Sequence, residues 1–113
     1  MLERPGLRKN RRPDITSLDA GGKMPPQAIE FEEAILGAVM LEKEALKDAM
    51  ETLQAKHFYV DNHQHVYECM LDLYNENQPV DILTVTEKLK VKGFLDVVGG
   101  PYFIAKLTSK VSS

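Results

Sequence analysis

The sequence predicts an all-α fold, and two observations support that prediction. Apolar residues recur three and four positions apart in five successive segments, which is the spacing of one buried helix face. No segment alternates apolar and polar residues for long enough to indicate a half-buried strand. With 113 residues, of which 43% are hydrophobic and 27% charged, the chain has the length and composition of one globular domain.

The first helix is expected to begin near Pro25–Pro26, with Pro26 in its first turn, a position that proline suits. Gly37 lies inside this helix, where it costs roughly 1 kcal/mol relative to alanine, so we expect a neighbouring helix to pack closely there. Acidic residues in the early turns suit the helix dipole, and they are Glu30, Glu32 and Glu33. The apolar face consists of Ile29, Ile35, Leu36, Val39 and Met40.

The second and third helices follow from the same periodicity. Residues 43–54 place Leu46, Ala49, Met50 and Leu53 on one face. In the next segment, Asp61 followed by Gln64 has the spacing of an N-cap with its reciprocal partner. The buried side of this third helix is expected to hold Val66, Tyr67, Met70, Leu73 and Tyr74.

The last two helices carry the clearest terminal signals. Thr84 and Glu87 form the T-x-x-E pattern of a capping box, and Gly93 stands where a left-handed C-cap residue belongs. These signals predict a helix from Val85 to Lys92. In the final segment, Gly100 is expected to cap a helix that begins at Pro101, and Gly99–Gly100 to form the corner before it.

Charge is unevenly divided along the chain. Residues 1–24 carry six basic and three acidic side chains, whereas the remainder carries eight basic and 14 acidic ones. Because this first stretch has little apolar surface and no periodicity, we expect a disordered basic tail over residues 1–24 and a helical domain over residues 25–113. Its RKNRR run (residues 8–12) either contacts phosphates or is a solvated leader, and the second interpretation is favoured.

The absence of targeting signals predicts a cytosolic protein. No apolar run is long enough to span a bilayer, and the start lacks the apolar core of a signal peptide. Cys69 is the one cysteine, so no internal disulfide can form.

Paired glycines before a helix raise the possibility of a phosphate-binding loop, which the spacing argues against. The motifs G-x-x-x-x-G-K-[ST] and G-x-G-x-x-G follow a buried strand. Gly93, Gly99 and Gly100 have neither spacing, no Lys-Ser/Thr pair follows them, and a helix is predicted before them. We therefore expect no nucleotide site, no cofactor and no enzymatic activity in this chain.

Two other kinds of site were considered and disfavoured. His57, His63, His65 and Cys69 lie within thirteen residues, but zinc needs three or four converging ligands, and His63 lies on a different helical face from His65 and Cys69. We expect a packed cysteine, unreactive as a nucleophile, with surface or capping histidines. The lysines at positions 88, 90 and 92, together with the basic tail, define the alternative of a small DNA-binding helical module, although the body is net acidic.

Three blocks of residues together resemble the N-terminal domain of replicative DNA helicases of the DnaB family. The first block is similar to that family's L-E-x-E-x-x-V-L-G opening, and the second to its F-Y-x-x-x-H-x-x-I-[FY] pattern. The third is similar to its P-[IV]-D-x-x-T…L…G-x-L-x-x-x-G-G-x-x-Y run. The residues that carry the likeness are, for the first block, Ile29-Glu30, Glu32 and Ile35-Leu36-Gly37; for the second, Phe58-Tyr59, His63 and Val66-Tyr67; and for the third, Pro79-Val80-Asp81, Thr84, Leu89, Gly93, Leu95-Asp96, Gly99-Gly100 and Tyr102.

The resemblance implies a compact orthogonal bundle of five to six helices over residues 25–113, truncated before a helical hairpin, a linker and the ATPase domain. It also implies a non-catalytic collar domain that contacts other copies of itself, as a dimer or as the collar of a hexamer, and that docks primase or the helicase loader. The parent would be an ATP-dependent 5′–3′ DNA helicase of the bacterial cytosol, associated with the nucleoid at replication forks. ATP and magnesium would act in its C-terminal domain, DNA would be met only through the whole assembly, and no membrane is implied.

The partner surface expected from these considerations is the last helix and its approach. Some apolar side chains there should remain exposed for a partner protein, although most are expected to enter the core. The candidates are Phe94, Leu95, Tyr102 and Phe103.

Overall fold

A computed structural model describes residues 25–111 of the chain. The expectation of a disordered tail over residues 1–24 falls outside the described residues. Within them, every regular element is helical and no strand occurs, which confirms the predicted all-α bundle. The elements are α2 (Pro26–Leu41), α3 (Lys43–Met50), the short 3₁₀ helix η1 (Ala55–His57), α4 (Asp61–Asn75), α5 (Ile82–Lys92), α6 (Leu95–Val98) and α7 (Gly100–Ser109).

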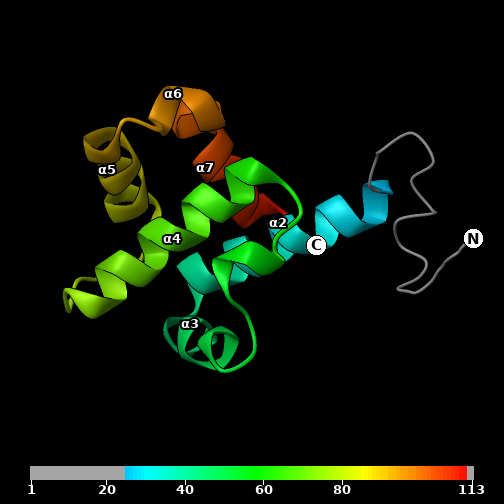
Figure 1. Cartoon of the computed structure of the whole chain (residues 1–113), viewed down its shortest axis with the longest axis horizontal. Coiled ribbons are helices and arrows are strands. Elements are labelled where there is room, and N and C mark those ends of the chain that lie inside the picture. The colour runs from blue at the N-terminus through cyan, green and yellow to red at the C-terminus, as the bar shows by residue number, and fades with distance from the viewer. Residues whose placement is uncertain (1–24, 112–113) are drawn as a thin grey trace, which may run out of the picture.

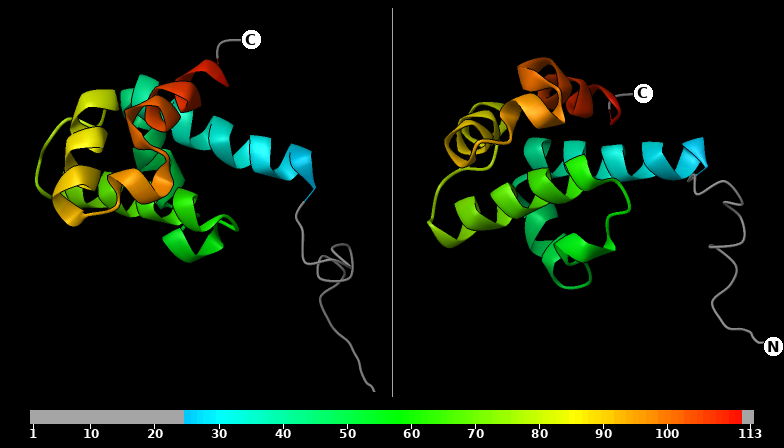
Figure 2. Two further views of the ribbon diagram at one scale, coloured as in Figure 1. Left: turned by 90° about the horizontal axis from the view of Figure 1, so that it is seen from above. Right: turned by 45° about the horizontal axis from the view of Figure 1, so that its top comes forward.

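Helix α4 runs through the middle of the bundle and contacts α2, η1, α5 and α6, whereas α3 and α7 pack on α2 (Figure 1). Helices α2 and α7 lie side by side although they are far apart in the sequence, and α5 and α6 both pack against α4, with α6 next to α7 (Figure 2). The shared core contains Leu36, Val39, Met40, Leu46, Phe58, Val66, Tyr67, Cys69, Met70, Leu73, Val85, Leu89, Val98, Ile104 and Leu107. Apolar side chains from α2, α3, α4, α5, α6 and α7 therefore contribute to one hydrophobic centre.

Gly37 lies where α2 and α7 approach most closely. A Cβ atom built on it would be 2.1 Å from the backbone oxygen of Leu107 and 2.9 Å from a methyl group of Val111. The absence of a side chain at this position lets the two helices touch through their backbones, as the mid-helix glycine leads one to expect.

The start of α5 differs from the sequence-based expectation. The N-cap is Asp81, whose carboxylate accepts a hydrogen bond from the Thr84 amide at 2.9 Å, while the Thr84 hydroxyl accepts one from the Asp81 amide at 2.9 Å. The capping box is thus Asp81–Thr84, not Thr84–Glu87, and α5 begins at Ile82 instead of Val85. Aspartate is the stronger N-cap of the two candidates, so the helix starts one turn earlier. At its other end, Gly93 is left-handed with φ 85°.

The start of α4 also differs. Asp61 is not the N-cap but the first helical residue, and Val60 occupies the cap position without a side-chain capping bond. The side-chain amide of Gln64, expected to pair with Asp61, donates instead to the Phe58 carbonyl at 2.7 Å. The backbone amides of Tyr59 and Val60, just before α4, donate to the carboxylate of Glu32 on α2.

The corner formed by Gly99 and Gly100 connects the end of α6 to the start of α7. Gly99, with φ 114°, ends α6 and is the N-cap of α7. Gly100, with φ 80°, is already the first residue of α7, so the expectation that Gly100 caps a helix starting at Pro101 is wrong by one residue. The cause is α6, a single turn that the periodicity did not indicate, because Gly99 is needed to terminate it.

Candidate interaction surface

The four residues expected to form a partner surface do not share one environment. Phe94, Leu95 and Phe103 are half-buried and pack against the core, whereas the Tyr102 side chain is 75% exposed. Of these four residues, Tyr102 on α7 therefore has the one strongly exposed ring. We call the accessible side of residues 94, 95, 102 and 103 the α6–α7 face.

Two histidines of α4 support this face from below. The Phe94 ring stacks on the His65 ring with 4.0 Å between centroids, and the Phe103 ring stacks on the His63 ring at 6.1 Å. The Lys106 ammonium lies 5.8 Å from the Tyr102 ring centroid and 5.9 Å from that of Phe103, within the range of a cation–π contact. The α6–α7 face is thus held in place by aromatic contacts to α4.

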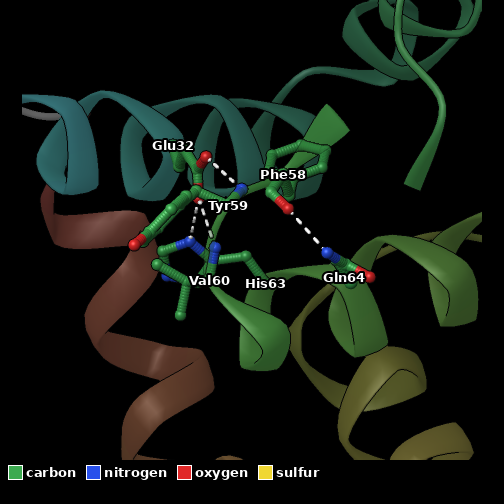
Figure 3. A network of polar contacts seen from close by, with 6 residues as sticks. All are labelled: Glu32, Phe58, Tyr59, Val60, His63 and Gln64. Carbon is green, nitrogen blue, oxygen red and sulfur yellow. Dashed lines mark hydrogen bonds and ion pairs between the residues drawn. The ribbon is translucent and has the colours of Figure 1, made fainter. Parts of the chain in front are cut away.

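A buried polar network connects α2 to the same region (Figure 3). The Glu32 carboxylate is 2.7 Å from Nδ1 of His63, and it accepts hydrogen bonds from the amide of Tyr59 at 2.7 Å and from that of Val60 at 3.4 Å. Both side chains are buried, with Glu32 7% and His63 1% exposed. Because a carboxylate only accepts hydrogen bonds, Nδ1 of His63 carries the proton of their shared bond.

Glu32 therefore acts as a cap for α4 supplied by a different helix. The backbone amides at the start of a helix need acceptors, and the dipole at this end favours a negative charge. Val60 has no side-chain oxygen to cap the amides further along α4. The Glu32 carboxylate instead accepts from the backbone amide of Val60, the cap residue, and from that of Tyr59 just before it. Bonds to a charged acceptor are roughly twice as strong as neutral ones, so the network should fix α2, the loop before α4 and His63 relative to each other.

This network was not predicted from the sequence pattern. The pattern placed Glu32 in a favourable dipole position of α2 and His63 at the surface or at a cap, whereas both are buried and paired. A signal was available, because Glu32, Tyr59 and His63 all belong to the residue blocks that resemble the helicase family. Helical periodicity alone cannot reveal a carboxylate that serves another helix.

The cysteine and histidines do not assemble a reactive centre. Burial raises the pKa of the Cys69 thiol to about 11, so the thiol stays protonated near neutral pH. Among residues 25–111, no group of three or more histidine, cysteine, aspartate or glutamate side chains is placed to hold a metal ion. A hollow of about 480 Å³ lies between the start of α3 and the loop after α4, and its walls mix apolar residues such as Val39, Leu46 and Val80 with polar ones such as Asn77 and Gln78.

Two of the three α5 lysines considered for DNA binding form ion pairs within the protein. Lys88 pairs with Glu76 at 2.8 Å, and Lys92 pairs with Asp72. The hydrogen bond from Lys92 to that carboxylate raises the pKa of Lys92. Of the predicted cluster, Lys90 alone has no acidic partner in the part of the chain that the structure describes, which weakens a phosphate-binding interpretation of α5.

Residues 25–111 thus form an all-helical domain in which α4 is joined to α2 by a buried polar network. This chain belongs to the family described as the DnaB-like helicase N-terminal domain, whose model matches residues 24–113. The family named from the three sequence blocks is therefore confirmed.

Individual relatives agree with this assignment. The chain is 41% identical over 92 residues to the replicative DNA helicase DnaB of Rhodothermus marinus and 42% identical over 92 residues to that of Treponema pallidum. Each match covers 81% of this chain but only 10% and 21% of the relative's length, respectively. Among solved structures, the crystal structure of the N-terminal domain of DnaB helicase from Mycobacterium tuberculosis is similar, with a TM-score of 0.75 and 38% identity over 80% of this chain and 65% of that one.

No helix among residues 25–111 combines the length and apolar character that crossing a membrane requires.

Proposed function

We propose that this chain is the non-catalytic collar domain of a hexameric replicative DNA helicase in the bacterial cytosol. In this role it contacts other copies of itself and docks primase or the helicase loader. The observation that carries the proposal is the family match over residues 24–113, together with relatives that are named replicative DNA helicases. ATP hydrolysis, with its magnesium, is assigned to a separate domain of the parent protein.

The surface proposed for docking is the α6–α7 face. Tyr102 is the exposed aromatic side chain on this face, and aromatic residues are enriched among those that dominate binding energy. Phe94 and Phe103, which stack on His65 and His63, would keep the face rigid on binding. A rigid face lowers the entropy lost when a partner docks.

A binding measurement tests this proposal. Primase and loader from the source organism would be titrated against the chain by isothermal calorimetry, with Tyr102→Ala as the test variant. We expect the variant to weaken binding of one of the two partners by about tenfold or more, as loss of an aromatic anchor does. Tyr74→Ala, which removes a 41% exposed ring from α4, is the matched control. Equal affinity for wild type and Tyr102→Ala would exclude the α6–α7 face, and failure of both partners to bind would contradict the docking role.

The second candidate function, a small DNA-binding module, depends on the basic tail and the lysines of α5. Fluorescence anisotropy with labelled duplex and single-stranded DNA at two salt concentrations separates it from the collar role. Because Lys88 and Lys92 are paired with acidic residues, we expect binding by residues 25–113 to be negligible. Micromolar, steeply salt-dependent binding that survives deletion of residues 1–24 would favour the DNA-binding module instead.

The assignment of ATP hydrolysis to another part of the parent has its own test. The reading frame beyond Ser113 should contain G-x-x-x-x-G-K-[ST], the phosphate-binding motif of such ATPases. Measurable ATP turnover by the 113-residue chain alone would contradict the assignment.

A further inference from the structure

The hollow between α3 and the loop after α4 has the size and the mixed lining of a ligand site. Its volume of about 480 Å³ lies within the range of ligand pockets, roughly 300–1,000 Å³. Val39 and Leu46 are buried and form an apolar floor, to which the loop adds Pro79 and Val80. The remaining lining residues are polar, and they are Lys43, Tyr74, Asn77 and Gln78. The hollow shares no residue with the α6–α7 face, so it is a separate site.

The polar groups of this lining are left without partners inside the protein. Lys43 is the one charged residue of the lining, and no acidic side chain pairs with it among residues 25–111. The side chains of Tyr74, Asn77 and Gln78 likewise make no hydrogen bond within that range. A lysine, a phenol and two carboxamides thus surround an apolar floor with their hydrogen-bonding capacity unused.

The charge of the lining is opposite to that of the domain around it. Residues 25–113 carry eight basic and 14 acidic side chains, yet none of the acidic ones lines the hollow. Glu42 and Glu44 flank Lys43 in the sequence, and both lie outside the lining. A ligand in the hollow therefore meets one positive charge beside apolar surface, which favours a ligand with an anionic group next to an apolar one.

We propose that the hollow binds the carboxyl-terminal end of a peptide chain whose last side chain is apolar. The terminal carboxylate pairs with the Lys43 ammonium, and the last side chain covers Val39 and Leu46. Carboxamides both donate and accept hydrogen bonds, so Asn77 and Gln78 suit the N–H and C=O groups of the peptide. A small free acid would offer the carboxylate and the apolar group but not these peptide groups. Capture of a chain-terminal carboxylate is a recurring mode of peptide recognition.

The expected affinity is modest. Lys43 is exposed, so its ion pair with the ligand is weakened by solvent, and covering the apolar floor supplies much of the binding free energy. The carboxylate then decides which ligands are accepted more than how tightly they bind.

Nuclear magnetic resonance titration of the whole 113-residue chain tests the proposal. The probe is the acetylated tripeptide Ala-Ala-Leu with a free carboxylate, and the comparison probes are the same peptide with a carboxyl-terminal amide and acetyl-leucine. We expect the free-acid peptide to shift the backbone signals of residues 43, 46, 77 and 80. The amide peptide should bind about fivefold or more weakly because it lacks the charge that meets Lys43. Acetyl-leucine should also bind about fivefold or more weakly, because it lacks the preceding peptide groups.

Two variants separate a direct contact from a structural effect. Lys43→Ala should weaken binding of the free-acid peptide by about fivefold or more and leave binding of the amide peptide unchanged. Lys47→Ala, exposed on the same helix and outside the hollow, is the matched control for both peptides. Asn77→Gly removes a carboxamide without backbone strain, because Asn77 has φ 61°, which glycine adopts freely. This variant should weaken binding of both peptides by about twofold or more.

The proposal is overturned if the free-acid peptide leaves the signals of the lining residues unshifted at millimolar concentration, if the two peptides bind equally, or if Lys43→Ala matches Lys47→Ala. Acetyl-leucine binding as tightly as the free-acid peptide would overturn the assignment to a chain end and make the hollow a site for small acids. None of these outcomes involves Tyr102, so they are distinct from failure of the proposed docking role.

Discussion

Glu32 is a residue whose importance is evident only in three dimensions. Its carboxylate bonds to His63 and to two loop amides, all from segments distant in the sequence. Its neighbour Glu30 is exposed on the same helix and makes no such contact within residues 25–111, which makes the two glutamates a natural pair for comparison.

Glu32→Gln should lower the free energy of unfolding by about 1–3 kcal/mol, because the amide keeps the size of the side chain but loses the charge that strengthens these hydrogen bonds. Glu30→Gln should change it by no more than about 0.5 kcal/mol, as surface substitutions usually do. Urea unfolding followed by circular dichroism measures both. If the two variants lost stability equally, Glu32 would not be the cap of α4.

Gly99→Val should lower the melting temperature strongly. Gly99 has φ 114°, which side chains with Cβ atoms rarely adopt, and an added Cβ would lie 3.2 Å from Cβ of Phe103. The expected cost is about 1–3 kcal/mol for the backbone alone. Gly100→Val should cost less, since nothing lies within 4 Å of its Cβ position. Scanning calorimetry checks the order, with Ala105→Val on exposed α7 surface as the control for β-branching, and unchanged melting at Gly99 would refute the corner role.

At the scale of single elements, α5 shows how two capping signals can compete. The sequence contains D-x-x-T and T-x-x-E in the same register, and both satisfy the spacing of a capping box. The structure uses the first, with Asp81 as the N-cap.

Asp81→Ala should therefore destabilise the chain by about 0.5–2 kcal/mol, the usual cost of losing an N-cap. Glu87→Ala should cost no more than about 0.5 kcal/mol, because Glu87 lies on the exposed face of the helix. Thermal unfolding of the two variants distinguishes the alternatives, and the reverse order would restore Thr84–Glu87 as the capping box.

The elements themselves could largely be predicted from sequence, as could the first residues of α2 and α3, whereas the first residues of α4, α5 and α7 could not. Periodicity located α2, α3, α4, α5 and α7 because each buries one face, and this signal is local. The start of α4 depends on Glu32, which is in another helix, and the short α6 has too few residues for a periodic pattern.

The environment of the candidate partner residues could also be predicted only in part. Sequence indicated that Phe94 and Phe103 are apolar, but only the structure shows that they stack on His65 and His63, leaving Tyr102 exposed.

At the scale of the whole molecule, the contact between Gly37 and Leu107 holds the first and last described helices together. Glycine is normally unfavourable inside a helix, so Gly37→Ala would stabilise α2 by about 1 kcal/mol on helix propensity alone. Here the new Cβ would overlap the Leu107 carbonyl, and the helices would have to separate. We expect the clash to dominate and to destabilise the protein by about 1–3 kcal/mol. A rise in stability, measured by chemical denaturation, would show that α7 can move away freely.

The tertiary cap on α4 also has a consequence for the order in which the chain folds. Helix α5 contains its own start and stop signals, whereas the first turn of α4 is completed only when α2 has docked. We accordingly expect α5 to be formed already in the folding transition state, and the first turn of α4 to form after it. In the native state, the amides of Tyr59 and Val60 would exchange with solvent only when α2 detaches, so their protection reports on the motion of a helix to which they do not belong.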